Sequence, residues 1–370
     1  MSTDTISLEL HVFYEHVIRC TTPEELFGVL RGDQSEQIVL LRTIFRQMAL
    51  VAHADRYVDA RDKDVAQRAF SMLNGLHQAA LTRIANKTYG TTDATNKIIL
   101  KSKRGIYEVV APMASGDLSL VYKGQSSDGT PIVAKIAKSA AVMDLFAVEA
   151  AALKALNHAA LATTSYKQFI PRLVDTFAIQ MPPSPDKRQV HILGEATGMR
   201  ALTEVVAQYP GGVDPRHVIW IWNRLLSVLS FAHSQGFVHG AVLPQNLLIH
   251  PVDHSIHLID WCFACRPGGR IVATSRGYDG YYPPEVKAKR HATAATDIYM
   301  SAMCMCYLLG ADYGEGLDAK APHRLCRFLE SCLIRNPARR PLDAWQVYQE
   351  LAEVSTALFG TRRYIELVMA

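Results

Sequence analysis

The chain lacks a hydrophobic run long enough to cross a bilayer. Its longest apolar stretch, Ile298 to Leu309, spans 12 residues, whereas a transmembrane helix needs about 20. The first residues, Met1 to Leu10, are polar and acidic before they are apolar, which is not the pattern of a secretory signal peptide. We therefore expect no membrane association and a cytoplasmic location.

The chain also lacks a strong charge of one sign. Its formal net charge is +4, and no block rich in lysine and arginine stands out. Because a nucleic-acid partner usually requires a basic patch, we expect none. Hydrophobic residues make up 49% and charged residues 20% of the 370 positions, as in globular proteins of this length with two domains.

Cysteine is too sparsely arranged to indicate a disulfide framework or a zinc site. There are seven cysteines, an odd number without a secretory signal, which favours reduced thiols. Cys262 and Cys265 have the spacing of half a zinc site, but no second pair accompanies them. Cys304 and Cys306 lie in a stretch expected to be a buried helix, so we interpret these thiols as core residues.

One motif carries most of the functional information. The run His239 to Asn246, with Pro244 inside it, is followed by Asp260 after an apolar stretch. In protein kinases a His-Arg-Asp loop supplies the Asp that accepts the proton of the substrate hydroxyl, and an Asn five residues later binds magnesium. On this frame, and on further blocks in register, residues of about 105 to 358 resemble a protein-kinase domain.

The nucleotide-handling residues of that family have counterparts here. Lys135 lies at the end of a strand-like run, residues 131–136, and resembles the lysine that pairs with the α/β-phosphates and with a helical Glu. From residue 144 to 156 apolar residues recur at helical spacing, and Glu149 is the only acid inside that run.

The resemblance also implies a metal and cofactor site. Asp260 stands where the family's Asp-Phe-Gly acid chelates magnesium, although Trp261 and Cys262 replace Phe and Gly. ATP and Mg²⁺ are therefore the expected cofactors. The residues implied to bind the nucleotide are Gly116, Val121, Lys135, Glu149 and Glu195, and those implied to bind the metal are Asn246 and Asp260.

The glycine-rich loop of the family is only partly present. The segment from Ala114 to Val121 keeps Gly116 as the middle glycine, and Asp117 adds a negative charge near the expected phosphates. Backbone amides can cradle phosphate without every glycine, but side chains in place of hydrogens hinder close approach. Whether nucleotide binds stays open at this point.

The groups that handle the acceptor are absent. Ala241 replaces the catalytic Asp, Leu243 the lysine after it, and Tyr278 the threonine of the activation segment. Gly240 replaces the arginine that pairs with a phosphorylated loop, so that form of switching is not expected. A positioned base contributes on the order of 10² to 10⁴ in rate. We therefore interpret the domain as a pseudokinase scaffold or regulator with no catalytic residue.

An enzyme remains the alternative. Magnesium-nucleotide held by the retained residues could support phosphoryl or nucleotidyl transfer if a base came from elsewhere. Asp117, Asp253 and Asp279 are the conceivable bases, although the family uses none of these positions.

The framework residues of the family are retained. Glu285 follows a segment similar to the end of an activation loop, and Arg340 lies in a block similar to the family's closing motif. Asp297 opens a helical stretch. The resemblance implies a buried ion pair between Glu285 and Arg340, and an Asp297 carboxylate that holds the backbone of the catalytic loop.

The first 90 residues have a different pattern. A helical stretch from Glu36 to Val51 carries one apolar stripe, and a second runs from Asp62 to about Ile84, with Phe70 and Leu73 expected to face inward. The stripe of the first stretch contains Ile38, Leu41, Ile44, Phe45, Met48 and Ala49.

The loop between these two stretches supplies the resemblance. His53 and Asp55 flank Ala54 there, so residues of about 24 to 85 resemble a J-domain, which stimulates heat-shock chaperones through a His-Pro-Asp loop. Ala54 takes the place of the proline that would stiffen the turn. A heat-shock chaperone is therefore a possible partner, and a plain helical pair used for docking is the alternative.

The expected fold is α+β. An N-terminal J-like helical hairpin (1–90) and a linker (91–104) precede a bilobal protein-kinase-like domain (105–370), with a small β-rich lobe over about 105–195 and a large helical lobe over about 196–370. A proline-rich turn, Met181 to Arg188, is expected to join two strands of the small lobe.

Overall fold

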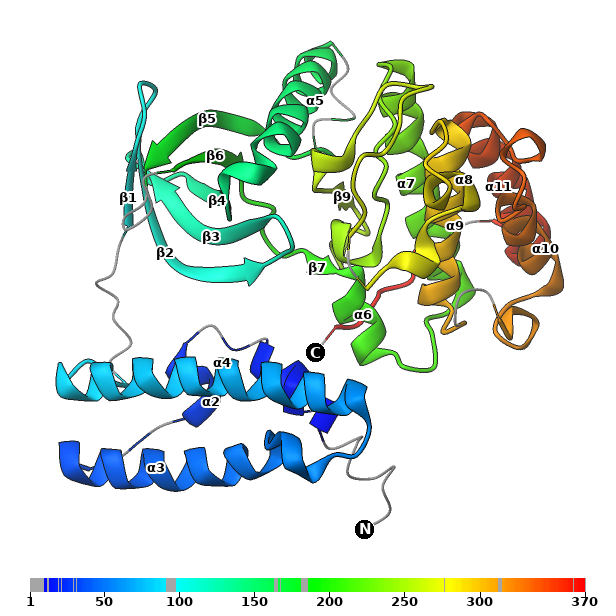
Figure 1. Ribbon diagram of the computed structural model, residues 1–370. Helices are drawn as coiled ribbons and strands as arrows, with labels where there is room; N and C mark the ends of the chain where they lie inside the picture. The colour runs from blue at the N-terminus through cyan, green and yellow to red at the C-terminus, as the bar shows by residue number, and fades with distance from the viewer. Residues whose placement is uncertain are drawn as a thin grey trace. The chain divides into compact units, whose positions relative to one another are not determined.

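The computed structural model divides the chain into two compact units, Met1–Asn96 and Lys97–Ala370, whose elements are labelled in Figure 1. The residues it describes are 10–11, 13–18, 20, 22–28, 30, 32–90, 98–162, 166, 168–180, 186–275, 277–311, 315–361 and 363–369.

The first unit is built on two long helices that lie side by side, α3 (Gln34–Val51) and α4 (Ala60–Ala85), with a short helix α2 (Pro23–Phe27) beside them. Asp33 caps the start of α3 with a capping box. Its carboxylate accepts a hydrogen bond from the backbone amide of Glu36, and the Glu36 carboxylate accepts one from the backbone amide of Asp33. Reciprocal caps of this kind satisfy two of the unpaired amides at a helix start.

The apolar stripe predicted for α3 packs into the core of this unit, and Leu41 and Leu73 are fully buried. The prediction for Phe70 was wrong, because its side chain is 38% exposed. The Phe70 ring packs against the ring of Phe45 at a centroid distance of 6.5 Å. Phe70 therefore covers the edge of the hydrophobic core and does not fill the centre of that core.

The small lobe of the second unit is a six-stranded antiparallel sheet in the order β1-β2-β3-β4-β6-β5, with helix α5 (Met143–Leu161) against it (Figure 1). The strands are β1 (Ile98–Lys101), β2 (Ile106–Ser115), β3 (Ser119–Ser126), β4 (Pro131–Ala137), β5 (Leu173–Gln180) and β6 (Lys187–Gly194).

The segment expected to be a linker is partly a strand. Residues 98–101 form β1, which pairs with β2 so that Ile98 lies opposite Val109. Burial of the Leu100 side chain beside the ring of Tyr107 favours this pairing. Residues 91–97 of that segment, and residues 181–185 of the proline-rich turn, lie outside the described residues.

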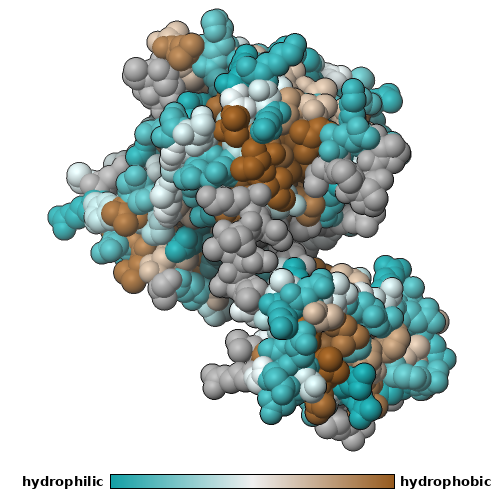
Figure 2. Space-filling model, turned by 90° about the vertical axis from the view of Figure 1, so that its left-hand side faces the viewer, coloured by the Kyte–Doolittle hydropathy of each residue, from teal (hydrophilic) through white to brown (hydrophobic). Residues whose placement is uncertain are grey.

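Hydrophobic residues gather on the surface of the small lobe that Figure 2 faces. The exposed apolar side chains of β1 and β2 include Ile98, Ile99, Ile106 and Val110. Because β1 is an edge strand that pairs only with β2, the charge of Lys101 opposes further strand addition there.

The large lobe is helical and encloses the largest hydrophobic core of the chain. Its strands form a small sheet in the order β7-β8-β9. The elements are β7 (Arg200–Ala201), α6 (Leu202–Gln208), α7 (Pro215–Ser234), β8 (Leu247–Ile249), β9 (Ile256–Leu258), α8 (Pro284–Lys287), α9 (Ala294–Leu308), α10 (His323–Cys332) and α11 (Ala344–Phe359).

Two framework predictions for the large lobe are confirmed. Glu285 and Arg340 form a buried bidentate ion pair with N to O distances of 2.8 and 2.9 Å. Asp297, near the start of α9, accepts from the backbone amides of His239 and Gly240 at 2.8 and 2.9 Å.

All seven cysteines are free, and Cys304 and Cys306 are buried in α9 as predicted. Burial raises the pKa of the Cys306 thiol to about 12, so it stays protonated. Among the described parts of the chain, no helix has the length and apolar character needed to span a membrane.

The second unit should lose stability on acidification. Burial lowers the pKa of His257 on β9 to about 4, whereas an unfolded histidine titrates near 6.5. The unfolded chain therefore binds a proton first as the pH falls from 6.5 towards 4, which lowers the free energy of unfolding. We expect His257→Gln to remove about 2 kcal/mol of this loss at pH 5.

Urea unfolding at pH 7.5 and pH 5.0, followed by tryptophan fluorescence, measures this difference. All four tryptophans (220, 222, 261 and 345) belong to the second unit, so the signal reports that unit. Equal losses in the wild type and in the variant would contradict the assignment of His257.

Candidate functional site

A buried lysine lies at the centre of the candidate site. Lys135 is in β4, between Val121 of β3 and His191 of β6 in the sheet register, and its side chain is 8% exposed. Successive side chains of β4 point to opposite faces of the sheet. Ala134 and Ile136 pack into the core of the small lobe, so Lys135, which lies between them, points to the other face, towards α5 and the large lobe.

The ammonium of Lys135 is surrounded by three acidic or polar groups. Its Nζ lies 2.8 and 2.9 Å from the two carboxylate oxygens of Glu149 on α5, and 2.6 Å from Oδ1 of Asp260. It also lies 3.3 Å from Sγ of Cys262. The Lys135–Glu149 pair and Asp260, predicted from three separate motifs, are thus in direct contact.

Charge explains why this lysine stays protonated although it is buried. Burial alone would lower the pKa of Lys135, but Asp260, Cys262 and Glu149 together raise it well above its usual value. Conversely, burial opposes the charge of Asp260, but the Lys135 ammonium holds the pKa of that carboxyl below its usual range. The pair is therefore ionised at neutral pH.

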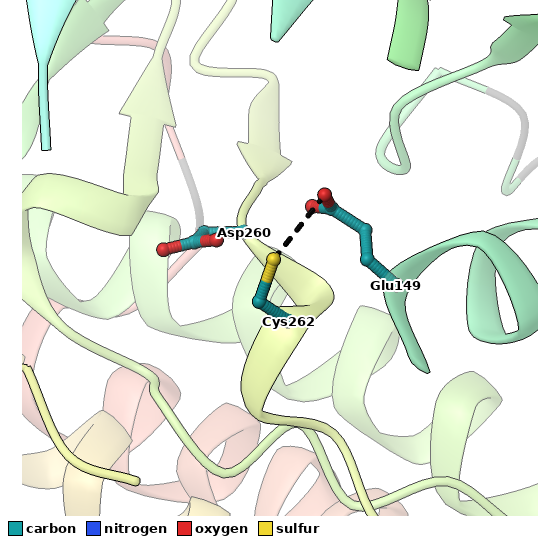
Figure 3. A group of neighbouring side chains, drawn as sticks. All are labelled: Glu149, Asp260 and Cys262. Atoms are coloured by element: carbon teal, nitrogen blue, oxygen red, sulfur yellow. Dashed lines mark hydrogen bonds between the residues drawn. The ribbon is translucent and has the colours of Figure 1, made fainter. Parts of the chain in front are cut away.

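Residues 260–262 connect the large lobe to α5 through contacts with Glu149. Asp260 has a left-handed backbone, with φ 65° and ψ 63°, an uncommon conformation that asparagine and aspartate tolerate best. The backbone amide of the next residue, Trp261, donates a hydrogen bond to Glu149 at 3.1 Å. The Cys262 thiol also donates to Glu149, at 3.4 Å, and Figure 3 shows this second bond.

The ring of Trp261 is held away from the lysine. Its indole nitrogen donates to the carbonyl of Leu258 at 2.9 Å, its edge meets the ring of His239, and the side chain is fully buried in the large-lobe core. Burial also raises the pKa of Cys262 well above its usual value, so the thiol acts here as a neutral hydrogen-bond donor.

Glu149, Asp260 and Cys262 form a cluster of three potential metal ligands, whose ligand atoms lie within 4.8 Å of one another. Lys135 supplies the positive charge at this cluster, since its Nζ contacts all three side chains. The contacts therefore describe an ion-pair network and give no reason to place a further cation among these three groups.

Ala241 lies in a loop that keeps its shape through backbone contacts. Its amide donates to Nδ1 of His239 at 3.2 Å, and its carbonyl accepts from Nδ2 of Asn246 at 3.0 Å. The other nitrogen of His239 contacts the carbonyl of Ile259 at 3.0 Å. This loop therefore lies directly beside the strand that leads to Asp260, with a methyl group at position 241.

Asn246 and Asp260 carry oxygen atoms that suit a magnesium ion. The amide nitrogen of Asn246 is used by Ala241, which leaves the amide oxygen for a cation, and the amide of Ile259 donates to the carbonyl of Asn246 at 2.9 Å. Asn246 and Asp260 would thus supply the oxygens that Mg²⁺ prefers, and Lys135 would contact the phosphates.

The turn that contains Gly116 joins β2 to β3, and a Cβ at Gly116 would meet nothing within 4 Å. Next to it, Oδ2 of Asp117 accepts from Oγ of Ser275 at 3.2 Å, and Ser275 Oγ accepts from Nε2 of Gln245 at 3.0 Å. A hydrogen-bonded chain therefore connects the small-lobe turn to the loop of Ala241.

Sequence reasoning missed Ser275 and Gln245 as members of this site, because neither type is distinctive in a loop.

Glu195, which the sequence placed among the nucleotide-binding residues, follows β6, and its carboxylate pairs with Lys123 at 3.0 Å. Asp253 lies in the turn between β8 and β9, where it accepts from the amide of Ser255. Asp279 begins a short 3₁₀ turn before α8.

Comparison with known proteins agrees with this geometry. The protein kinase domain family matches residues 107–313, more than half of the chain. The chain therefore belongs to the protein kinase family, and its small and large lobes are those of a kinase fold.

The relatives are distant serine/threonine kinases. Serine/threonine-protein kinase PknL of Mycobacterium tuberculosis is 27% identical over 73% of this chain and 70% of its own length. Serine/threonine-protein kinase F of Synechocystis is 26% identical over 47% of this chain, and this chain spans only 35% of it. Maternal embryonic leucine zipper kinase of Danio rerio is 30% identical over 24% of this chain and 14% of its own length.

Breaking the buried ion pair should destabilise the kinase domain strongly. Lys135→Met leaves the buried carboxylate of Glu149 and the partly buried carboxylate of Asp260 without their cation, and removing one partner of a buried pair typically costs about 3 to 5 kcal/mol. Urea unfolding at pH 7.5, followed by tryptophan fluorescence, gives the change in the free energy of unfolding.

Lys123→Met is the matched control. It removes the same type of charge from the same sheet, but Lys123 is 54% exposed, so its loss should cost less than about 1 kcal/mol. Similar costs for the two variants would show that the buried network does not stabilise the domain.

Proposed function

We propose that this chain is a pseudokinase, a regulatory or scaffold member of the family that holds partners and does not transfer phosphate by the usual route. The observation that carries the proposal is Ala241. Its backbone is anchored by His239 and Asn246, so the loop is formed, yet its side chain offers no carboxylate to accept a proton.

The same proposal includes nucleotide binding as a conformational signal. The contacts of Lys135 with Glu149 and Asp260 support it, because these groups would meet the phosphates and the magnesium ion. ATP would then bind across the cleft between the two lobes and change the balance between open and closed arrangements.

One observation favours the alternative of an active phosphoryl or nucleotidyl transferase. Of the three candidate bases, Asp117 is connected through Ser275 and Gln245 to the loop of Ala241, whereas Asp253 accepts hydrogen bonds in the turn between β8 and β9. Asp117 would be the base in that alternative. We rank this alternative second because the Asp117 carboxylate already accepts a hydrogen bond from Ser275.

A thermal-shift titration with ATP and magnesium tests the nucleotide site. Ligand at a hundredfold excess over Kd should stabilise the wild type by about 2.7 kcal/mol. Lys135→Met and Asp260→Asn should lose this stabilisation relative to their own unliganded states, because one removes the phosphate contact and the other a magnesium ligand. Lys123→Met should keep it. No shift in the wild type would leave a scaffold without nucleotide control.

The same samples, incubated with labelled ATP, separate pseudokinase from transferase. We expect no label on the chain or on a generic acceptor protein above background. Incorporation that is lost in Asp117→Asn would overturn the pseudokinase proposal in favour of the alternative base.

For the helical unit we propose a separate role as a J-like docking module in the cytoplasm, where the free cysteines would stay reduced. His53 and Asp55 lie in the loop between α3 and α4, their side chains are 58% and 90% exposed, and Nδ1 of His53 accepts from the amide of Asp55. Both polar groups are therefore accessible to a heat-shock chaperone.

Chaperone ATPase assays with the full chain test this role. We expect weak stimulation that His53→Gln and Asp55→Asn abolish, and that Ala54→Pro increases severalfold because proline restricts the turn. Arg68→Gln, which alters an exposed ion pair elsewhere on α4, serves as the control. No stimulation by wild type or Ala54→Pro would leave a plain helical docking pair.

A further inference from the structure

A second cavity lies in the large lobe, among residues that the nucleotide cleft does not use. It has a volume of about 440 Å³ and lies between the first half of α7, the end of α11 and the segment that follows α11. Such a volume is in the range of small-molecule sites, about 300 to 1,000 Å³. The residues that determine its chemistry are Arg216, His217, Trp220, Asn223, Arg363 and Tyr364.

The inner wall of this cavity carries an unpaired amide. Asn223 is 3% exposed, and neither its Oδ1 nor its Nδ2 has a hydrogen-bond partner among the described residues. Nδ1 of His217 is likewise unpartnered. Since a buried polar group without a partner costs about 1 to 3 kcal/mol, the wall is incomplete without a ligand or water.

Aromatic rings line the same cavity. The ring of Tyr364 meets the edge of Trp220 at a centroid distance of 5.9 Å, and Tyr364 is held there because its hydroxyl donates to the carbonyl of Val252 at 2.6 Å. His254 packs against Trp220 behind them. The planes of the two rings cross at 87°, so a planar ligand can stack on one ring while its edge meets the other.

Two arginines, Arg216 and Arg363, are among the residues that line the cavity. Arg216 is neutralised by a bidentate contact with Asp214, but no hydrogen bond or ion pair is formed by Arg363 within the part of the chain that the structure describes. Burial lowers the pKa of His217, so its ring is neutral at pH 7. Among the described residues that line it, the cavity therefore presents the unpaired guanidinium of Arg363 together with uncharged polar groups.

We propose that this cavity is a binding site for a purine mononucleotide, separate from the ATP cleft. The amide of Asn223 would pair with the base edge, as an asparagine pairs with the N6 and N7 atoms of adenine. Tyr364 would stack on the base while Trp220 meets the edge of the base, and Arg363 would bind the phosphate, a group that arginine recognises well.

AMP is the first probe, and GMP, CMP and UMP are the comparison. Isothermal titration with the full chain, without magnesium, should detect AMP binding that Arg363→Gln weakens about tenfold, the equivalent of 1.4 kcal/mol. Asn223→Leu should also weaken it at least tenfold and reduce the preference for AMP over UMP. Lys135→Arg, which keeps a cation at the other site but alters its phosphate contact, should leave AMP binding unchanged.

The stability of Asn223→Leu provides a second readout. An unpaired amide replaced by an apolar side chain of similar size should leave the unliganded protein equally or more stable, so loss of binding would not reflect unfolding. Three results would overturn the proposal: no binding of any of the four mononucleotides at millimolar concentration, binding lost in Lys135→Arg, or binding unaffected by both Asn223→Leu and Arg363→Gln.

Discussion

The contact of one buried ammonium with two carboxylates organises the kinase domain. Lys135 belongs to the small-lobe sheet, Glu149 to α5, and Asp260 to the large lobe, so a single charged group joins three elements. Each partner would be unfavourable in the interior by itself, because burial opposes every one of these charges. The position of α5 against the sheet places Glu149 next to Lys135, and the left-handed backbone at Asp260 accompanies the contact of its carboxylate with the same ammonium.

The loop of Ala241 keeps its shape through contacts that do not involve the side chain at position 241. Asp297 fixes the amides of His239 and Gly240, and Asn246 fixes the carbonyl of Ala241. These contacts are made by the backbone at position 241, so they do not depend on the side chain there. The shape of this loop is therefore compatible with an alanine at position 241.

Much of this arrangement could be predicted from the sequence, since Lys135, Glu149 and Asp260 each follow a motif with a characteristic period and spacing. The contacts of Ser275 could not be predicted, because they depend on how a loop without periodic pattern folds back against the turn of Asp117. Phe70 was misplaced for a related reason: helical spacing identifies a stripe, but only packing decides where its edge lies. The strand at residues 98–101 was missed because its pairing with β2 is a tertiary contact.

The hydrogen bond between Asp117 and Ser275 has a thermodynamic consequence for the two lobes. Together with the contact of Lys135 and Asp260, it spans the cleft at a second point, one close to the turn and the other beneath the sheet. Complete separation of the two lobes would break both contacts, so both of them oppose it. The free energy of separating the lobes therefore depends on Ser275 as well as on the buried lysine.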